Sequence, residues 1–181
     1  PHLFSSAASD VYKRQVKSIS GGDVQLRFHE PNALVPSLEV WDAVKNGSVD
    51  AGYTTPGYHA GKIPAVSYFT AVPFGPGASE YHGWMEYGGG QQLKDRIYGE
   101  YGLKALNCLT HAPETSGWFR KKINNVEELK GMKMRFFGLG AMVMSKLGVS
   151  TQLLAGGDIY PALEKGAVSY THLRAHETNV D

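Results

Sequence analysis

Residues 125–166 read NVEELKGMKMRFFGLGAMVMSKLGVSTQLLAGGDIYPALEKG, and this part of the chain has the most regular pattern. Residues 132–137 alternate in side-chain type and predict a strand, and residues 140–147 predict a helix. A second strand at 151–154 and a helix at 159–165 follow. Strand, helix, strand and helix at this spacing predict an α/β fold with parallel strand pairing.

Local signals mark the ends of these helices. Asn125, with Glu128 three residues later, forms a capping-box-like start for a short helix that Gly131 ends. Gly148 follows the end of the next helix, and Asp158 is a candidate N-cap for the last one.

Upstream of this stretch the expected elements are less regular. Val24 to Phe28 alternates apolar and polar side chains, as a half-buried strand does, and Val49 to Tyr53 predicts another short strand. Between them Ser37 is a candidate N-cap for a helix over residues 38–46. After a loop at 54–64 rich in turn formers, two helices are expected, one begun by Ser79 and one near 90–101.

The sole cysteine of the chain is Cys108, so no intrachain disulfide can form. Its context, Leu106-Asn107-Cys108-Leu109, predicts a strand. We therefore expect a buried structural thiol rather than a nucleophile.

Composition excludes several classes of function. The 181 residues are 42% hydrophobic and 19% charged, with a formal net charge of +1, which gives no electrostatic case for nucleic-acid binding. No apolar stretch approaches the roughly 20 residues that span a bilayer, so direct membrane insertion is not expected. Nothing near the start has the layout of a signal peptide, so an export signal, if the protein has one, is expected to be missing from this chain.

The two ends of the chain look foreign to its middle. Residues 1–15, PHLFSSAASDVYKRQ, and residues 169–181, SYTHLRAHETNVD, resemble translated sequencing-adapter read-through, and we expect both tails to pack poorly. His172 and His176 have the spacing of metal ligands on one helix face, but they lie in the second tail and are set aside.

Arg135 is the first candidate site residue. In the predicted strand, one face carries Met132, Met134 and Phe136. The other face carries Lys133, Arg135 and Phe137. A guanidinium in a covered sheet must find an anion, and its planar fork suits a carboxylate. The residues alone leave three alternatives open: a ligand carboxylate, an internal salt bridge, or exposure at the strand end.

The other candidates are a carboxylate and several aromatic residues. Glu114 lies in a bend flanked by proline and glycine, where it would either hold a hard cation or face water. Tyr53, Tyr58 and Trp118 offer apolar bodies with polar handles for lining a small-molecule site, and Phe137 shares the face of Arg135. For each aromatic residue, packing in the core or at its rim is the alternative.

No catalytic motif is complete. The run Gly88-Gly89-Gly90 lacks the lysine of a phosphate-binding loop, and Gly138-x-Gly140 lacks the third glycine of a dinucleotide site. There is no G-x-S-x-G, H-E-x-x-H or C-x-x-C. We therefore expect no enzyme.

Residues 18–168 resemble the middle of a receptor of the tripartite ATP-independent periplasmic (TRAP) transporters, in the branch that handles 2-oxo acids and other monocarboxylates. The stretches that carry the resemblance, in the order of the family, are LVPSLEVWDAV (34–44), VDAGY (49–53), AVPFG (71–75), GGGQ (88–91), GWF (117–119), LKGMKMR (129–135) and GGDIYPALEKGA (156–167).

The resemblance implies two α/β lobes joined by crossing strands, with the ligand held in the cleft between them. Residues 16–108 would form most of lobe one, and residues 109–168 a crossover strand and the first half of lobe two. It also implies that Arg135 pairs with the substrate carboxylate. Position 114 falls where related receptors help to bind a metal ion bridged to the ligand. Glu114 should favour a divalent ion such as calcium over sodium.

The implied function is capture of a small carboxylate in the periplasm and its delivery to a TRAP membrane permease, with no bond made or broken. Two alternatives remain at this point. One is a small α/β enzyme that anchors a carboxylate substrate through Arg135, and the other is a receptor-like domain used for sensing.

Overall fold

The computed structural model describes residues 6–108, 110, 117–119 and 121–171, with side chains described from residue 10 onward. The chain forms two compact units, Pro1–Ser37 and Leu38–Asp181. The first is called the N-terminal unit and the second the main unit.

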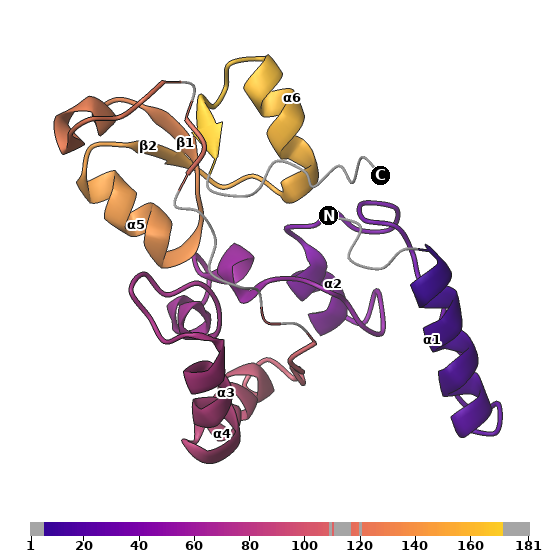
Figure 1. The fold of residues 1–181 in the computed structure, drawn as a ribbon. Coiled ribbons are helices and arrows are strands. Elements are labelled where there is room, and N and C mark those ends of the chain that lie inside the picture. Colours follow the sequence, from indigo (N-terminus) through magenta and orange to yellow (C-terminus); the bar gives the residue numbers. More distant parts are fainter. Residues whose placement is uncertain (1–5, 109, 111–116, 120, 172–181) are drawn as a thin grey trace. The chain divides into compact units, whose positions relative to one another are not determined.

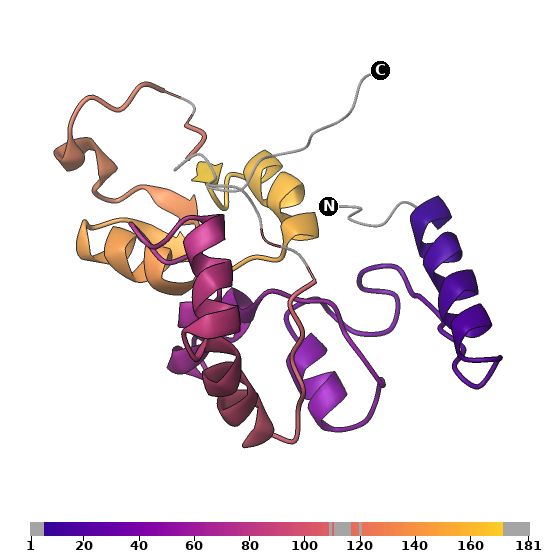
Figure 2. The same cartoon turned by 60° about the horizontal axis from the view of Figure 1, so that its bottom comes forward.

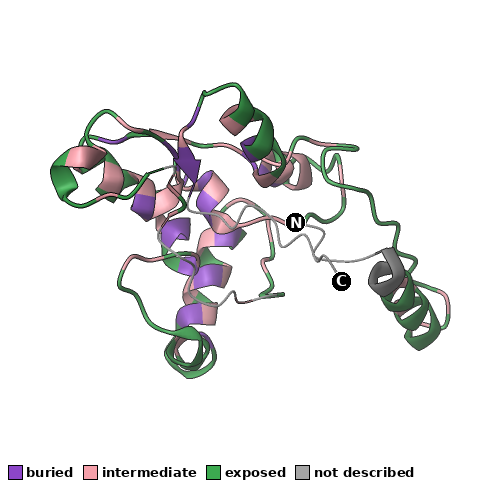
Figure 3. Ribbon diagram, turned by 45° about the horizontal axis from the view of Figure 1, so that its top comes forward, coloured by how far each residue is buried: buried purple, intermediate pink, exposed green. Residues whose placement is uncertain are grey.

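The N-terminal unit is built on one helix, α1 (Ser6–Ile19), which covers much of the first predicted tail. Its described side chains are exposed or half-exposed (Figure 3). The Tyr12 ring lies 6.3 Å from that of Phe28. The strand predicted over Val24 to Phe28 is wrong, because within the described part of this unit no second strand lies beside it to share backbone hydrogen bonds.

The first half of the main unit is helical (Figure 1). It contains α2 (Val40–Lys45), the 3-10 turns η1 (Pro56–His59) and η2 (Pro64–Phe69), α3 (Ala78–Tyr87) and α4 (Gly90–Gly99). Four buried side chains from these segments and from Ile63, which precedes η2, form the aromatic cluster: Trp41, Ile63, Val66 and Tyr98. The helices α3 and α4 contact each other side by side (Figure 2).

Four expectations for this part of the chain are wrong. Ser37 does not cap α2, because its backbone N–H and hydroxyl both bond Asn32 Oδ1, at 2.9 and 3.0 Å, and the helix begins at Val40. Val49 to Tyr53 is not a strand. The described residues around Cys108 form no strand either, and the thiol is exposed rather than buried.

The second half of the main unit is the predicted α/β segment. It contains η3 (Val126–Leu129), β1 (Lys133–Arg135), α5 (Gly138–Lys146), β2 (Ser150–Gln152), η4 (Gly156–Asp158), α6 (Ile159–Glu164) and β3 (Tyr170–Thr171). The strands run parallel in the order β2-β1-β3, with Met134 level with Thr151 on one side and Tyr170 on the other. Figures 1 and 2 show α5 and α6 flanking this sheet. The predicted α/β class with parallel pairing is confirmed.

The predicted start of η3 is also confirmed. Asn125 Oδ1 accepts from the backbone N–H of Glu128 at 3.1 Å, and Asn125 Nδ2 donates to the Glu128 carboxylate at 3.2 Å. Gly131 ends the turn with a φ of 76°, which costs a glycine nothing. Asp158 stands at the N-cap of α6 but makes no capping bond with its side chain.

The strand β3 corrects the expected boundary of the C-terminal tail. Tyr170 and Thr171 are buried, and the Ser169 N–H donates to Lys133 O at 2.8 Å. With Met134 and Val149, Tyr170 forms the sheet cluster of buried residues. The expectation of poor packing therefore fails for residues 169–171, because the alternation of Val168 and Tyr170 supplies buried side chains to the edge of β1.

None of the helices in the described residues combines the length and the apolar character needed to cross a bilayer.

Candidate functional site

The predicted facing of β1 is confirmed. Met134 is buried in the sheet cluster, with Met132 and Phe136 packed against it. Arg135, one residue later, points to the opposite face and is 0% exposed. A fully covered guanidinium excludes the alternative of simple exposure at the strand end.

Several groups surround the Arg135 side chain. Its Nε donates to the Leu154 carbonyl at 3.0 Å, and its Nη2 lies 3.4 Å from the Tyr58 hydroxyl. The guanidinium carbon lies 4.9 Å from the centre of the Phe137 ring, within cation–π range. The site thus joins β1 to η1, 77 residues earlier in the chain.

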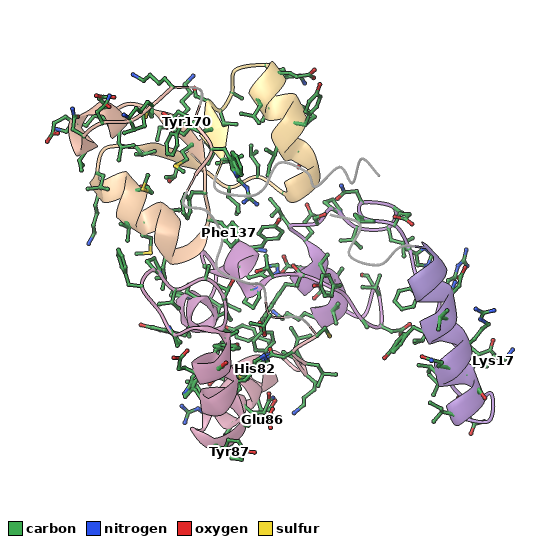
Figure 4. The ribbon with its side chains drawn as sticks, in the orientation of Figure 1. Lys17, His82, Glu86, Tyr87, Phe137 and Tyr170 are labelled. Carbon is green, nitrogen blue, oxygen red and sulfur yellow. The ribbon has the colours of Figure 1, made fainter. Side chains whose placement is uncertain are left out.

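Gly57 allows this junction to close. The Phe137 ring, labelled in Figure 4, meets the Tyr58 ring edge to face at 5.4 Å. A Cβ added at Gly57 would lie 2.3 Å from Phe137 Cε2, well inside contact distance. Only glycine therefore lets the η1 turn approach the ring this closely.

Tyr58 keeps a donor available. Its oxygen accepts from the Arg135 Nη2–H group, so the phenolic hydrogen can point to another acceptor. A cationic fork and a neutral O–H donor side by side are suited to two oxygens of one small anion.

The remaining predicted residues lie differently. Tyr53 is half-exposed, and partial burial, with a smaller contribution from Cys108, raises the pKa of its hydroxyl. Trp118 is 53% exposed and bridges β3 through its backbone N–H, which donates to Thr171 O at 2.8 Å. Glu114 lies outside the described residues, as do His111, His172 and His176. Arg135, Tyr58 and Phe137 are brought together.

A hollow of about 500 Å³ opens elsewhere in the main unit. Its walls include Phe119, Lys130, Lys133 and Tyr170, and Arg135 does not line it. In the site itself, the Arg135 side chain is fully covered, whereas Tyr58 and Phe137 are half-buried.

No group of three or more His, Cys, Asp or Glu side chains that could hold a metal ion occurs among the described residues.

His59 is the residue that the sequence reasoning missed. It ends η1, directly after Tyr58, and is 1% exposed. Its Nε2 lies 3.4 Å from Thr54 Oγ1, and its ring lies 5.4 Å from that of Trp41. Burial, and then the nearby Lys62, lowers the pKa of His59, while Asp42 acts in the opposite direction. Its signal was the run Gly57-Tyr58-His59, which places a titratable ring among turn formers and aromatics.

Comparison with known proteins identifies the family. Residues 2–170 match the family described as bacterial extracellular solute-binding protein, family 7. The chain belongs to this family. Family 7 proteins are solute-binding receptors of TRAP transporters and not enzymes.

A curated relative is the monocarboxylate 2-oxoacid-binding periplasmic protein of Nostoc sp. strain PCC 7120. It is 39% identical over 160 residues, which make up 88% of this chain and 44% of the relative. This chain therefore spans about half the length of the relatives it matches.

Two solved structures of TRAP periplasmic solute-binding proteins are also similar. The protein of Pseudoalteromonas atlantica, with bound sodium and pyruvate, gives a TM-score of 0.86 at 35% identity over 91% of this chain and 50% of that one. The protein of Colwellia psychrerythraea, with bound calcium and pyruvate, gives 0.85 at 35% identity over 92% and 51%. The described residues thus have the fold of part of a two-lobed family 7 receptor.

Proposed function

We propose that this chain belongs to an extracytoplasmic receptor that captures a small monocarboxylate, a 2-oxo acid such as pyruvate, and delivers it to a TRAP permease. The observation that carries the proposal is the meeting of Arg135, Tyr58 and Phe137 from two distant segments. Two similar TRAP periplasmic solute-binding proteins with pyruvate bound support the same class of ligand.

Binding needs no bond to form or break. The Arg135 guanidinium would donate two parallel hydrogen bonds to the ligand carboxylate, and the Phe137 ring against the guanidinium holds its plane. The Tyr58 hydroxyl would donate to a carboxylate or keto oxygen. Tyr58 and Arg135 come from segments on either side of Cys108. A ligand that forms hydrogen bonds to both residues therefore stabilises the arrangement in which these two segments are in contact.

A metal ion is part of the proposal. The two relatives hold sodium or calcium together with pyruvate. No group of three or more His, Cys, Asp or Glu side chains among the described residues could hold such an ion. Its proposed ligand, from the family resemblance, is Glu114, whose carboxylate suits calcium better than sodium. When bound, the ion would neutralise charge on the ligand carboxylate.

The periplasmic location and the permease partner are inferred from similarity to the relatives. The Nostoc relative is a periplasmic protein, and the solved relatives are TRAP receptors. Family membership favours this reading over the alternative of a small α/β enzyme that anchors its substrate through Arg135.

Arg135→Lys in the full-length protein is the direct test. Lysine keeps the charge but cannot supply two parallel donors, so we expect the loss of roughly 2 kcal/mol of pyruvate binding, more than about tenfold in affinity by calorimetry. The exposed Arg96→Lys is the matched control and should leave affinity unchanged.

The melting temperature separates binding from structure. If Arg135 has only an internal structural partner, Arg135→Lys should lower the melting temperature and leave pyruvate affinity intact. Removal of metal by a chelator tests Glu114 in the same experiment. Unchanged affinity without metal would leave Glu114 as a solvated or hydrogen-bonding residue.

A further inference from the structure

His59 is the most deeply buried titratable ring next to the proposed site. It is 1% exposed, and its Nδ1 finds no hydrogen-bond partner among the described residues. Its other nitrogen, Nε2, has only a long contact of 3.4 Å to Thr54 Oγ1. A neutral imidazole tolerates this setting, whereas an imidazolium has two N–H donors and a charge to satisfy.

The charged groups around His59 do not favour its protonation. Lys62, in the following turn, forms an ion pair with Asp42 of α2, so the nearest carboxylate is already engaged. Lys45, also on α2, lies over the Tyr101 ring at 5.6 Å. The neighbouring η2 contains no charged residue, only the exposed Tyr68 as a titratable group, and α5 contributes only Lys146, exposed in its last turn.

The position of His59 couples it to the proposed ligand site. It follows Tyr58 in the four-residue turn η1, and its carbonyl accepts from the N–H groups of Lys62 and Ile63, both at 2.9 Å. Its ring packs against Trp41 of the aromatic cluster. If the His59 ring leaves this position, the turn that brings the Tyr58 hydroxyl to Arg135 loses its packing against Trp41.

We propose that His59 is a positioning residue for ligand capture: its neutral, buried ring holds the η1 turn so that Tyr58 meets Arg135, and its protonation releases the turn and the ligand. This role rests on the proposed function, since it concerns the same carboxylate site.

The sign of the pH effect follows from burial. Burial lowers the pKa of His59 in the folded protein below its usual 6.5, so the ring stays neutral there at neutral pH. As the pH falls below 6.5, the ring takes up a proton first in states in which it is exposed. These states then gain stability relative to the state in which the ring is buried. Affinity is therefore full above this pH and declines below it.

Calorimetry of pyruvate binding to the full-length protein tests the proposal, at about pH 8 and about pH 5, with metal held constant. We expect the wild type to bind about tenfold more weakly at the lower pH, because the state in which the His59 ring is exposed then takes up a proton more readily than the state in which the ring is buried. His59→Phe, which keeps an aromatic ring but cannot titrate, should show less than about a twofold change. The exposed His29→Phe is the matched control and should behave as the wild type.

Tyr58→Phe tests the route of the effect. It removes the hydroxyl that meets Arg135, so the pH dependence of affinity should largely disappear. Emission from Trp41 reports on the ring separately, because an imidazolium quenches a neighbouring indole. That emission should still change with pH in Tyr58→Phe and should not in His59→Phe.

The outcomes separate the two proposals. The same pH dependence in His59→Phe as in the wild type, or pH-independent affinity in the wild type, overturns the positioning role and leaves the receptor function standing. If the wild type binds no 2-oxo acid at either pH, the receptor function itself fails. Should His59→Phe not fold, His59→Gln provides the same comparison.

Discussion

The aromatic cluster and the sheet cluster of the main unit are held together in different ways. In the aromatic cluster, the centre of the Trp41 ring lies 4.8–5.5 Å from the centres of the His59, Tyr98 and Tyr101 rings. Side chains from helices and short turns make these contacts. In the sheet cluster, backbone hydrogen bonds also join the segments, such as Ser150 N–H to Met132 O at 2.7 Å.

This difference implies unequal sensitivity to a single substitution. The aromatic cluster depends on one large side chain that touches several others, so its removal leaves a large cavity. The sheet cluster keeps its ladder of backbone bonds when a side chain is lost. We therefore expect the aromatic cluster to be the more fragile of the two.

Trp41→Ala should have the largest effect. Trp41 is buried at the centre of three ring contacts, and we expect a loss of about 4 kcal/mol in the free energy of unfolding, measured by urea denaturation. Trp118→Ala is the control, because Trp118 is 53% exposed and should cost about 1 kcal/mol or less. Equal losses in the two variants would show that the aromatic cluster does not depend on Trp41.

Met134→Ala should come second. Met134 is completely buried on the central strand, and its loss should cost about 3 kcal/mol in the same measurement, while the backbone bonds of β1 persist. Met142→Ala, at a position 61% exposed, should change the free energy of unfolding by less than about 0.5 kcal/mol. A cost for Met134→Ala above that of Trp41→Ala would reverse the proposed order of the clusters.

Asn125→Ala should have the smallest effect. It removes the side chain that caps η3 just before β1, and we expect a loss of about 1 kcal/mol. Asn124→Ala is the matched control, since Asn124 makes only a 3.5 Å contact to Glu128 and does not cap. An unchanged free energy of unfolding in Asn125→Ala would indicate that the structure around β1 does not depend on this cap.

Local patterns predicted the α/β segment well. Alternation over residues 132–137 was enough to place Met134 and Arg135 on opposite faces, because the strand period allows no other arrangement. Asn125 and Glu128 predicted their own hydrogen bonds, because a cap involves residues only three apart. Such features need no knowledge of the rest of the chain.

Features that depend on distant partners were predicted poorly. The alternation of Val24 to Phe28 is as regular as that of β1, yet a strand needs a neighbour, and alternation does not report one. Tyr170 and Thr171 fall within the predicted C-terminal tail, yet they pair with the edge of β1. In the proposed site, the facing of Arg135 was predictable, but its meeting with Tyr58 and the burial of His59 come from packing between segments.

The exposed thiol of Cys108 has a practical consequence. Because this sequence contains no other cysteine, a thiol-reactive dye would attach to it at a single atom without prior mutagenesis. The thiol lies along the chain between the two segments that meet at Arg135 and Tyr58. If these segments separate on ligand release, as proposed, a dye there would give an optical readout of the separation.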